Sequence, residues 1–290
     1  MDLPIVVGVD GSEPSLRAVD WAADEAALRG VPLWVLYASL WERYEGAALA
    51  KDLGKPSAQA LPQEITGAAT RRAQSRHPDL KVTADVVFEE PEYALVRESR
   101  NASVLVVGNR GRSGLVSALL GSVSLSVAAH AHCPVIVLRG CHNNQATPPV
   151  HGRVVMGVGE EAEDSAAVRF AYEEARRRQV PLEAVRAWRC PAHETTDHPL
   201  LADAPARLHE QHAEETLSAA LHDAPADVEL HRRTVEGHAR RVLVDASIGA
   251  DLLIVGAKRR TGHLGLQLGR VAHAALHHSA CPVAVVPQPT

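Results

Sequence analysis

The chain has 290 residues, of which 46% are hydrophobic and 22% are charged, and its formal net charge at pH 7 is -5. A chain of this length can bury two cores of ordinary size, so we expect two domains. The acidic balance argues against a general binder of nucleic acid or of membrane surfaces, because such proteins usually present a basic face. No stretch reaches the roughly 18 consecutive apolar residues of a membrane span. An apolar strand begins within a few residues of Met1, where a signal peptide would lie. We therefore expect a cytoplasmic protein.

Short apolar strands alternate with amphipathic helices along the first half of the chain. We expect strands near 4–9, 33–38, 82–88, 104–108 and 135–138, and helices near 14–29, 62–76, 91–101 and 121–131. These strands are β-branched, nearly continuously apolar and separated by helices, which predicts a parallel sheet covered on both faces. Right-handed crossovers make this a doubly wound α/β fold.

Glycines follow the strand at 104–108 with a spacing typical of a phosphate cradle. The segment Gly108-Asn109-Arg110-Gly111 is followed after nine residues by Gly121-Ser122, and Val123 and Ser124 then open a helix. Backbone N–H groups at such a strand end and helix start point to a shared spot, where they can hold phosphate. The alternative is an ordinary turn, which glycines also serve. The length of the pattern favours phosphate, and a Walker A loop is excluded because its motif does not occur.

A second candidate residue, Asp10, ends the first predicted strand. In an open α/β sheet, ligands lie beyond the carboxyl ends of strands where the winding direction reverses, so Asp10 and Gly108 face one crevice if their strands are neighbours. There the carboxylate can face ribose hydroxyls or, through water, a divalent cation. The alternative is a helix cap, in which Asp10 or Ser12 bonds the first turn of the helix that begins near Pro14.

The second half repeats the first, with changes at the candidate phosphate site. Its strands are expected near 153–158, 182–187, 228–235, 252–256 and 283–287, and residues 139–152 have the composition of a linker. At matching positions Gly159 replaces Asp10, Arg259 replaces Gly111 and Arg270 replaces Ser122. These losses predict that the second half does not bind the same phosphates, although an arginine can still attract a different anion.

Cysteines and histidines give weaker signals. Cys133 and Cys281 precede equivalent strands and no C-x-x-C spacing occurs, so we expect small buried residues in place of redox or metal sites. The sixteen histidines include His209 and His212 on one predicted helix face. A metal site needs three or four converging ligands, so we expect solvated histidines and no metal.

Together with the opening Val-Gly-Val-Asp-Gly-Ser and the segment His132-Cys133-Pro134-Val135, the glycine pattern resembles the universal stress protein family. The resemblance extends over nearly the whole chain as two tandem domains, which we place at 1–140 and 152–290. It implies in each domain a Rossmann-like parallel sheet of five strands in the order 3-2-1-4-5. It also implies that the first domain binds ATP, alone or with Mg²⁺, as its cofactor.

The family pattern, matched residue by residue, implies a set of contacts for ATP. Asp10 would approach the ribose and phosphate side, and Ala38 would meet adenine through its backbone. The ribose and phosphates would be surrounded by Gly108, Gly111, Gly121, Ser122 and Val123, with a hydroxyl from Ser124. One departure is Glu89-Glu90-Pro91, where the family often has Gly-acid-Pro. Carboxylates that point inward there would weaken nucleotide binding.

The resemblance implies a nucleotide-dependent regulatory protein of the stress response, read by protein partners that the sequence does not name. Two alternatives remain: a slow ATP hydrolase or nucleotidyl-transfer enzyme in the same crevice, and an interaction module that needs no nucleotide. In this family the fifth strands of two domains typically pair. We therefore expect the halves to form an intramolecular pseudo-dimer and two chains to form a homodimer.

Overall fold

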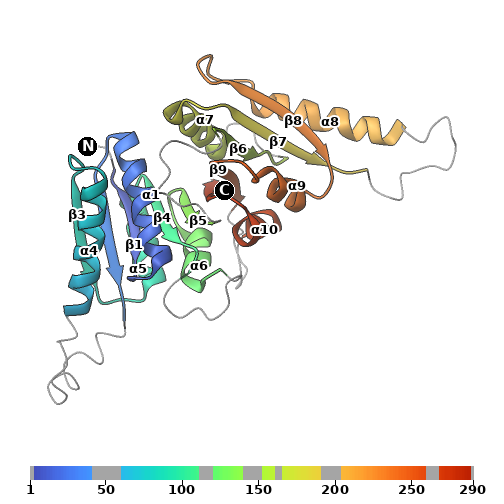
Figure 1. The fold of residues 1–290 in the computed structure, drawn as a ribbon. Coiled ribbons are helices and arrows are strands. Elements are labelled where there is room, and N and C mark those ends of the chain that lie inside the picture. Colours follow the sequence, from blue (N-terminus) through green and yellow to red (C-terminus); the bar gives the residue numbers. More distant parts are fainter. Residues whose placement is uncertain are drawn as a thin grey trace. The chain divides into compact units, whose positions relative to one another are not determined.

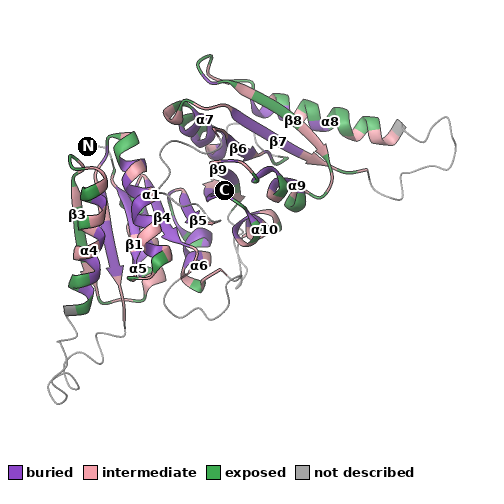
Figure 2. Ribbon diagram, viewed as in Figure 1, coloured by how far each residue is buried: buried purple, intermediate pink, exposed green. Residues whose placement is uncertain are grey.

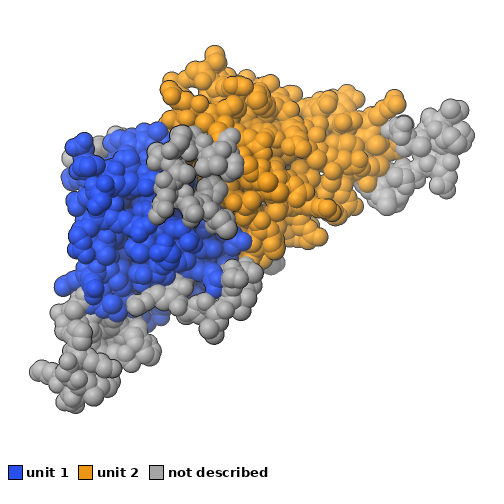
Figure 3. Space-filling model, viewed as in Figure 1, with its two compact units in different colours: residues 1–145, 262–267 blue, residues 146–261, 268–290 orange. Residues whose placement is uncertain are grey.

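The computed structural model describes residues 3–40, 60–110, 120–139, 152–160, 165–190, 204–258 and 268–288. These residues belong to two compact units, and the described part of the first ends at 139 while that of the second begins at 152 (Figure 3). Each unit is a parallel sheet with helices on both faces, so the predicted α/β class is confirmed. Across the described ranges no helix is long and apolar enough to cross a membrane.

Five parallel strands form the sheet of the first unit. The elements in chain order are β1 (Ile5–Val9), α1 (Glu13–Arg29), β2 (Leu33–Ala38), α4 (Ala60–Arg76), β3 (Val82–Val87), α5 (Pro91–Glu98), the 3-10 turn η1 (Ser99–Asn101), β4 (Val104–Gly108), α6 (Ser122–His130) and β5 (Val135–Leu138). The strand order is β3-β2-β1-β4-β5, as the resemblance implies. Helices α1 and α4 contact each other on one face, and α5 and α6 do so on the other (Figure 1).

The second unit repeats this arrangement. Its elements are β6 (Val154–Gly157), α7 (Ala166–Arg178), β7 (Leu182–Trp188), α8 (Ala204–Ala220), β8 (Leu230–Glu236), α9 (Ala239–Ala246), β9 (Leu252–Lys258), α10 (Arg270–His278) and β10 (Val283–Gln288). The strand order is β10-β9-β6-β7-β8, with every pairing parallel. All ten strands predicted from the sequence are present, with ends that differ by at most two residues.

Burial on both faces explains why the inner strands are apolar. Side chains such as Ile5 and Leu105 in the first unit and Met156 and Ile254 in the second are almost fully buried (Figure 2). Each buried side chain of this size contributes about 1.5–3 kcal/mol relative to an exposed one. The outer strands β3 and β8 instead carry several exposed residues. The inner strands are therefore held by packing on both faces. The loops that carry polar groups follow their carboxyl ends.

A close backbone approach determines which residue can end β4. A Cβ atom added to Gly108 would lie 2.9 Å from the carbonyl carbon and oxygen of Pro14, in the first turn of α1. A contact that short forces the backbone to shift. Because glycine has no Cβ, the start of α1 can pack directly against the carboxyl end of β4.

We expect Gly108→Ala to lower the free energy of unfolding of the first unit by about 1–3 kcal/mol, because the added methyl group overpacks this contact. Urea unfolding followed by circular dichroism measures the change. The matched control is Gly159→Ala, since a Cβ there meets no atom within 4 Å. A Gly108→Ala protein as stable as the control would show that this approach is not needed.

In each unit one buried cysteine lies just before the last strand. Cys133 is 6% exposed and Cys281 is fully buried. Burial raises the pKa of the Cys133 thiol to about 12 and that of the Cys281 thiol to about 11. Both residues have the buried position expected from the sequence, and at neutral pH both are protonated.

We expect iodoacetamide at pH 7.5 to modify the half-buried Cys190 before Cys133 and Cys281. The thiolate is the reacting species, and burial both suppresses it and blocks access. Peptide mapping by mass spectrometry of native and urea-denatured protein measures the order. Equal labelling of the three residues in the native protein would contradict their burial.

Candidate functional site

The first unit has a cavity of about 280 Å³ at the carboxyl ends of β1, β2 and β4. Strands β1 and β4 are direct neighbours in the sheet, with Val7 opposite Val106. The condition under which Asp10 and Gly108 share one crevice is therefore met. Open α/β sheets hold their ligands at this place, where the winding direction reverses.

The residues predicted from the sequence meet at this cavity. Its lining includes Asp10, Ala38, Gly108, Gly121, Ser122, Val123 and Ser124. The remaining predicted residue, Gly111, lies outside the described residues. Leu36, Leu95 and Val107 also line the cavity and were not among the predicted site residues. Their only sequence signal was the apolar pattern of a core.

The lining changes from apolar to polar across the cavity. Leu36 and Ala38 on β2, with Pro91 and Leu95 on α5, contribute an apolar wall. Asp10, Arg110 and the start of α6 contribute charge and backbone N–H groups. Such a surface suits a ligand with a flat apolar part and an anionic part.

Helix α6 starts beside this cavity on a glycine. Its N-cap, Gly121, has no side chain to accept from the first-turn N–H groups. The Gly121 N–H donates to the Asn109 carbonyl oxygen at 2.8 Å, and the buried Ser124 hydroxyl donates to the Gly108 carbonyl oxygen at 2.7 Å. The helix start is thereby fixed to the end of β4. Its N–H groups and dipole favour an anion there. The Ser124 hydroxyl, which the resemblance assigns to the ligand, donates its hydrogen bond to the protein backbone instead.

Asp10 takes part in the helix start as well as lining the cavity. Its Oδ1 accepts from the Ser12 N–H at 3.0 Å and from the Ser12 hydroxyl at 2.6 Å. The Ser12 Oγ caps α1 by accepting from the Ser15 N–H at 3.3 Å. The cap considered as the alternative is therefore present, with Ser12 as the capping residue. It orients the Asp10 carboxylate at the edge of the cavity.

The glutamates that depart from the family pattern do not line the cavity. Glu89 forms an ion pair with Arg97, and Glu90 precedes the first residue of α5. Hydrogen bonds to Glu89 and Glu98 raise the pKa of Arg97 above its ordinary value. Of the segment 89–91, only Pro91 contributes to the lining that the structure describes.

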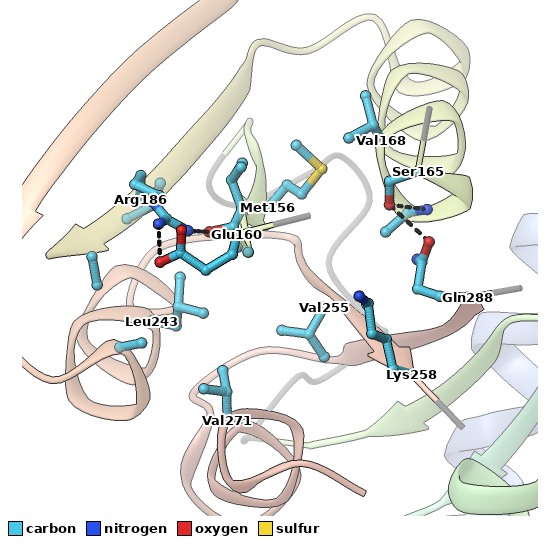
Figure 4. Close-up of a pocket in the computed structure, with 18 residues that line it drawn as sticks. Met156, Glu160, Ser165, Val168, Arg186, Leu243, Val255, Lys258, Val271 and Gln288 are labelled. Atoms are coloured by element: carbon cyan, nitrogen blue, oxygen red, sulfur yellow. Dashed lines mark hydrogen bonds and ion pairs between the residues drawn. The ribbon is translucent and has the colours of Figure 1, made fainter. Parts of the chain in front are cut away.

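The corresponding region of the second unit has a larger cavity of about 450 Å³ (Figure 4). Gly159 lines it and brings no carboxylate, and Arg270 is the first residue of α10. Arg259, the third predicted change, lies outside the described residues.

A glutamine side chain lies at the second unit's cavity, between the start of α7 and β9. Gln288 Oε1 accepts from the Ser165 hydroxyl at 2.9 Å and from the Ala166 N–H at 3.2 Å, at the start of α7. A Cβ added to Gly256, the counterpart of Gly108, would meet Gln288 Nε2 at 3.0 Å. The glutamine side chain therefore lies beside Gly256 of β9.

Sequence reasoning missed Gln288 and also missed Arg186 and Glu160. Arg186 is 5% exposed and its Nη2 donates to Glu160. A charged residue inside the apolar strand 182–187 was the one available signal for it. Within the described ranges, no group of three His, Cys, Asp or Glu residues is placed to hold a metal ion.

Comparison with known proteins places these features in a family. A family model described as the universal stress protein family matches the chain twice, over residues 3–139 and 151–287. Universal stress protein Rv2005c of Mycobacterium tuberculosis is 33% identical over 306 residues, which cover 98% of this chain and 97% of that protein.

Solved structures are similar as well. A universal stress protein from Archaeoglobus fulgidus DSM 4304 covers 98% of both chains with a TM-score of 0.68 and 17% identity, a likeness of fold. A universal stress protein in complex with cAMP is 32% identical and covers 47% of this chain and 96% of its own, with a TM-score of 0.37. The cAMP is the ligand of that protein.

Proposed function

Since the chain belongs to the universal stress protein family, we propose that it is a nucleotide-dependent regulatory protein whose first unit binds ATP. One observation carries this proposal. Seven residues predicted from separate parts of the sequence line a single cavity at the ends of β1, β2 and β4. The cavity offers an apolar wall at one part and an anion-binding helix start at another.

The lining suggests how the nucleotide is held. Leu36, Leu95 and the backbone of Ala38 form the surface for adenine. The backbone N–H groups of the Gly121-Ser122 helix start and the Arg110 guanidinium face the negative phosphates. Asp10 is the carboxylate for the ribose hydroxyls or for Mg²⁺ through water. Bound Mg²⁺ would neutralise phosphate charge in this acidic protein.

We propose a single ATP site per chain, in the first unit. The second unit lacks the Asp10 carboxylate, carries Arg270 at the helix start and has the Gln288 side chain beside Gly256. Calorimetry with Mg-ATP is expected to give a stoichiometry near one. Ser122→Arg, which copies Arg270 into the first unit, is expected to weaken binding about tenfold or more, or by at least about 1.4 kcal/mol, because the side chain enters phosphate space.

The matched control is the reverse change, Arg270→Ser, which is expected to leave both the affinity and the stoichiometry unchanged. Ser122 is exposed on the first turn of α6, so its replacement does not disturb the core. A stoichiometry near two, or full ATP affinity in Ser122→Arg, would contradict a single site in the first unit.

The same cavity is the place to test for enzymatic activity. We expect ADP release from ATP at no more than the spontaneous rate, because we propose that nucleotide occupancy shifts the protein between conformations with different partner affinity. Steady-state turnover measured with and without Asp10→Ala decides between binding and catalysis. Release well above the spontaneous rate that is abolished by Asp10→Ala would favour the hydrolase or transferase alternative.

A further inference from the structure

The large cavity of the second unit has apolar walls between two polar sides. Figure 4 shows Arg186 and Glu160 together on one side, and Ser165, Gln288 and Lys258 on the other. The walls between them are formed by Met156, Val158, Val168, Leu243, Val255 and Val271. A cavity of about 450 Å³ with such walls suits a small molecule with an apolar body.

Arg186 is a buried cation whose hydrogen bonds are incomplete. Its side chain is 7% exposed. Its Nη1 donates to the Val158 carbonyl oxygen at 3.2 Å, and its Nη2 donates to Glu160 Oε1. Its Nε is buried and has no hydrogen-bond partner among the residues that the structure describes. A guanidinium binds a carboxylate best when two adjacent N–H groups meet both oxygens, and Nε and Nη2 form one such edge.

The partner of Arg186 can be displaced. The Glu160 side chain is 72% exposed, and it reaches the guanidinium from the segment that follows β6. Its Oε1 occupies Nη2 and leaves Nε unmet. A carboxylate that enters from the cavity and binds both Nε and Nη2 makes a more complete contact. Glu160 then moves into water, where an exposed carboxylate is well solvated.

The charge of the lining limits the ligand. Among the described lining residues, Arg186 and Lys258 are cationic and Glu160 is anionic. Once Glu160 has moved into water, the lining is cationic, which favours a carboxylate on the ligand. A nucleoside triphosphate carries several negative charges, and the Gln288 side chain lies beside Gly256, which its phosphates would approach.

We propose that the second unit binds a small monocarboxylate with an apolar body, whose carboxylate takes the Nε and Nη2 edge of Arg186 and displaces Glu160. Glu160 is then a competitor built into the chain. This site is separate from the proposed ATP site in composition and in position along the chain.

Arg186 and Glu160 also border a smaller cavity of about 250 Å³, on the side of α8. Its lining includes Arg189, His209, His212 and His238. That lining is rich in polar groups and offers little surface for an apolar body. The larger cavity is therefore the one assigned to the ligand.

The test uses 4-phenylbutyrate as the carboxylate probe and 4-phenyl-1-butanol as its uncharged counterpart, titrated calorimetrically into the full-length protein. We expect one 4-phenylbutyrate to bind per chain. The alcohol is expected to bind more weakly than the acid, by about tenfold or more. Glu160→Gln is expected to tighten 4-phenylbutyrate binding about threefold or more, because a neutral amide competes less well for the guanidinium. The alcohol should not respond to this change.

Glu173→Gln is the matched control, because Glu173 is also an exposed glutamate paired with an arginine, on α7 outside the cavity lining. It should leave the affinity unchanged. Arg186→Met is expected to weaken 4-phenylbutyrate about tenfold or more, since the charge-assisted hydrogen bonds are lost. The variant leaves Glu160 in water, and a melting curve checks its fold. If it fails to fold, Glu160→Gln and Arg186→Lys carry the test, with Arg186→Lys expected to bind more weakly than wild type.

Unchanged or weaker binding in Glu160→Gln would overturn the proposal. Equal affinity for the acid and the alcohol, or no binding of 4-phenylbutyrate at millimolar concentration, would overturn it too. Calorimetry with Mg-ATP on the same samples tests the first unit independently. Loss of one binding event therefore does not affect the conclusion about the other.

Discussion

In each unit the glycine of the fourth strand packs closely against one neighbouring group at the cavity. In the first unit the backbone of Pro14 lies against Gly108, so that the start of α1 is fixed by main-chain atoms. The helix start at Gly121 lies beside the cavity and, among the described residues, receives no side-chain cap. In the second unit the Gln288 side chain lies against Gly256 and accepts from the first N–H of α7. The glycine of the fourth strand therefore meets main-chain atoms in the first unit and a side chain in the second.

The two units also differ in the carboxylate beside the cavity. Asp10 is anchored to Ser12, and through it to the first turn of α1, so its carboxylate stays at the edge of the cavity. In the second unit Gly159 stands in its place and the nearest carboxylate along the chain, Glu160, pairs with Arg186. A buried guanidinium is costly unless it is paired and hydrogen-bonded, so the arginine on β7 needs such a partner. The two cavities therefore differ in charge and in size although their strands are arranged alike.

Close packing limits which residues can occupy the buried strands, whereas the exposed loops can change with less effect on packing. Replacing a residue in the middle of the sheet, such as Leu105 or Ile254, leaves a hole among close-packed side chains and lowers stability. A glycine in place of Asp10 removes a polar group at the edge of the cavity and leaves no hole in the core. A duplicated domain can therefore keep its fold while the chemistry of its crevice changes.

The sequence alone determined the ten strands, the repeat and the doubly wound class, because apolar runs bounded by helices reflect burial that each segment experiences locally. It also indicated Asp10 and the glycines around Gly108, since a strand end has a recognisable pattern. The family resemblance implied the strand order, with β1 beside β4, and the structure confirms it. Only the tertiary structure decided that Gln288 reaches Ala166 and that Arg186 pairs with Glu160, contacts that span 122 and 26 residues of the chain. No local pattern encodes such a contact, because it depends on where the packed sheet brings two side chains together.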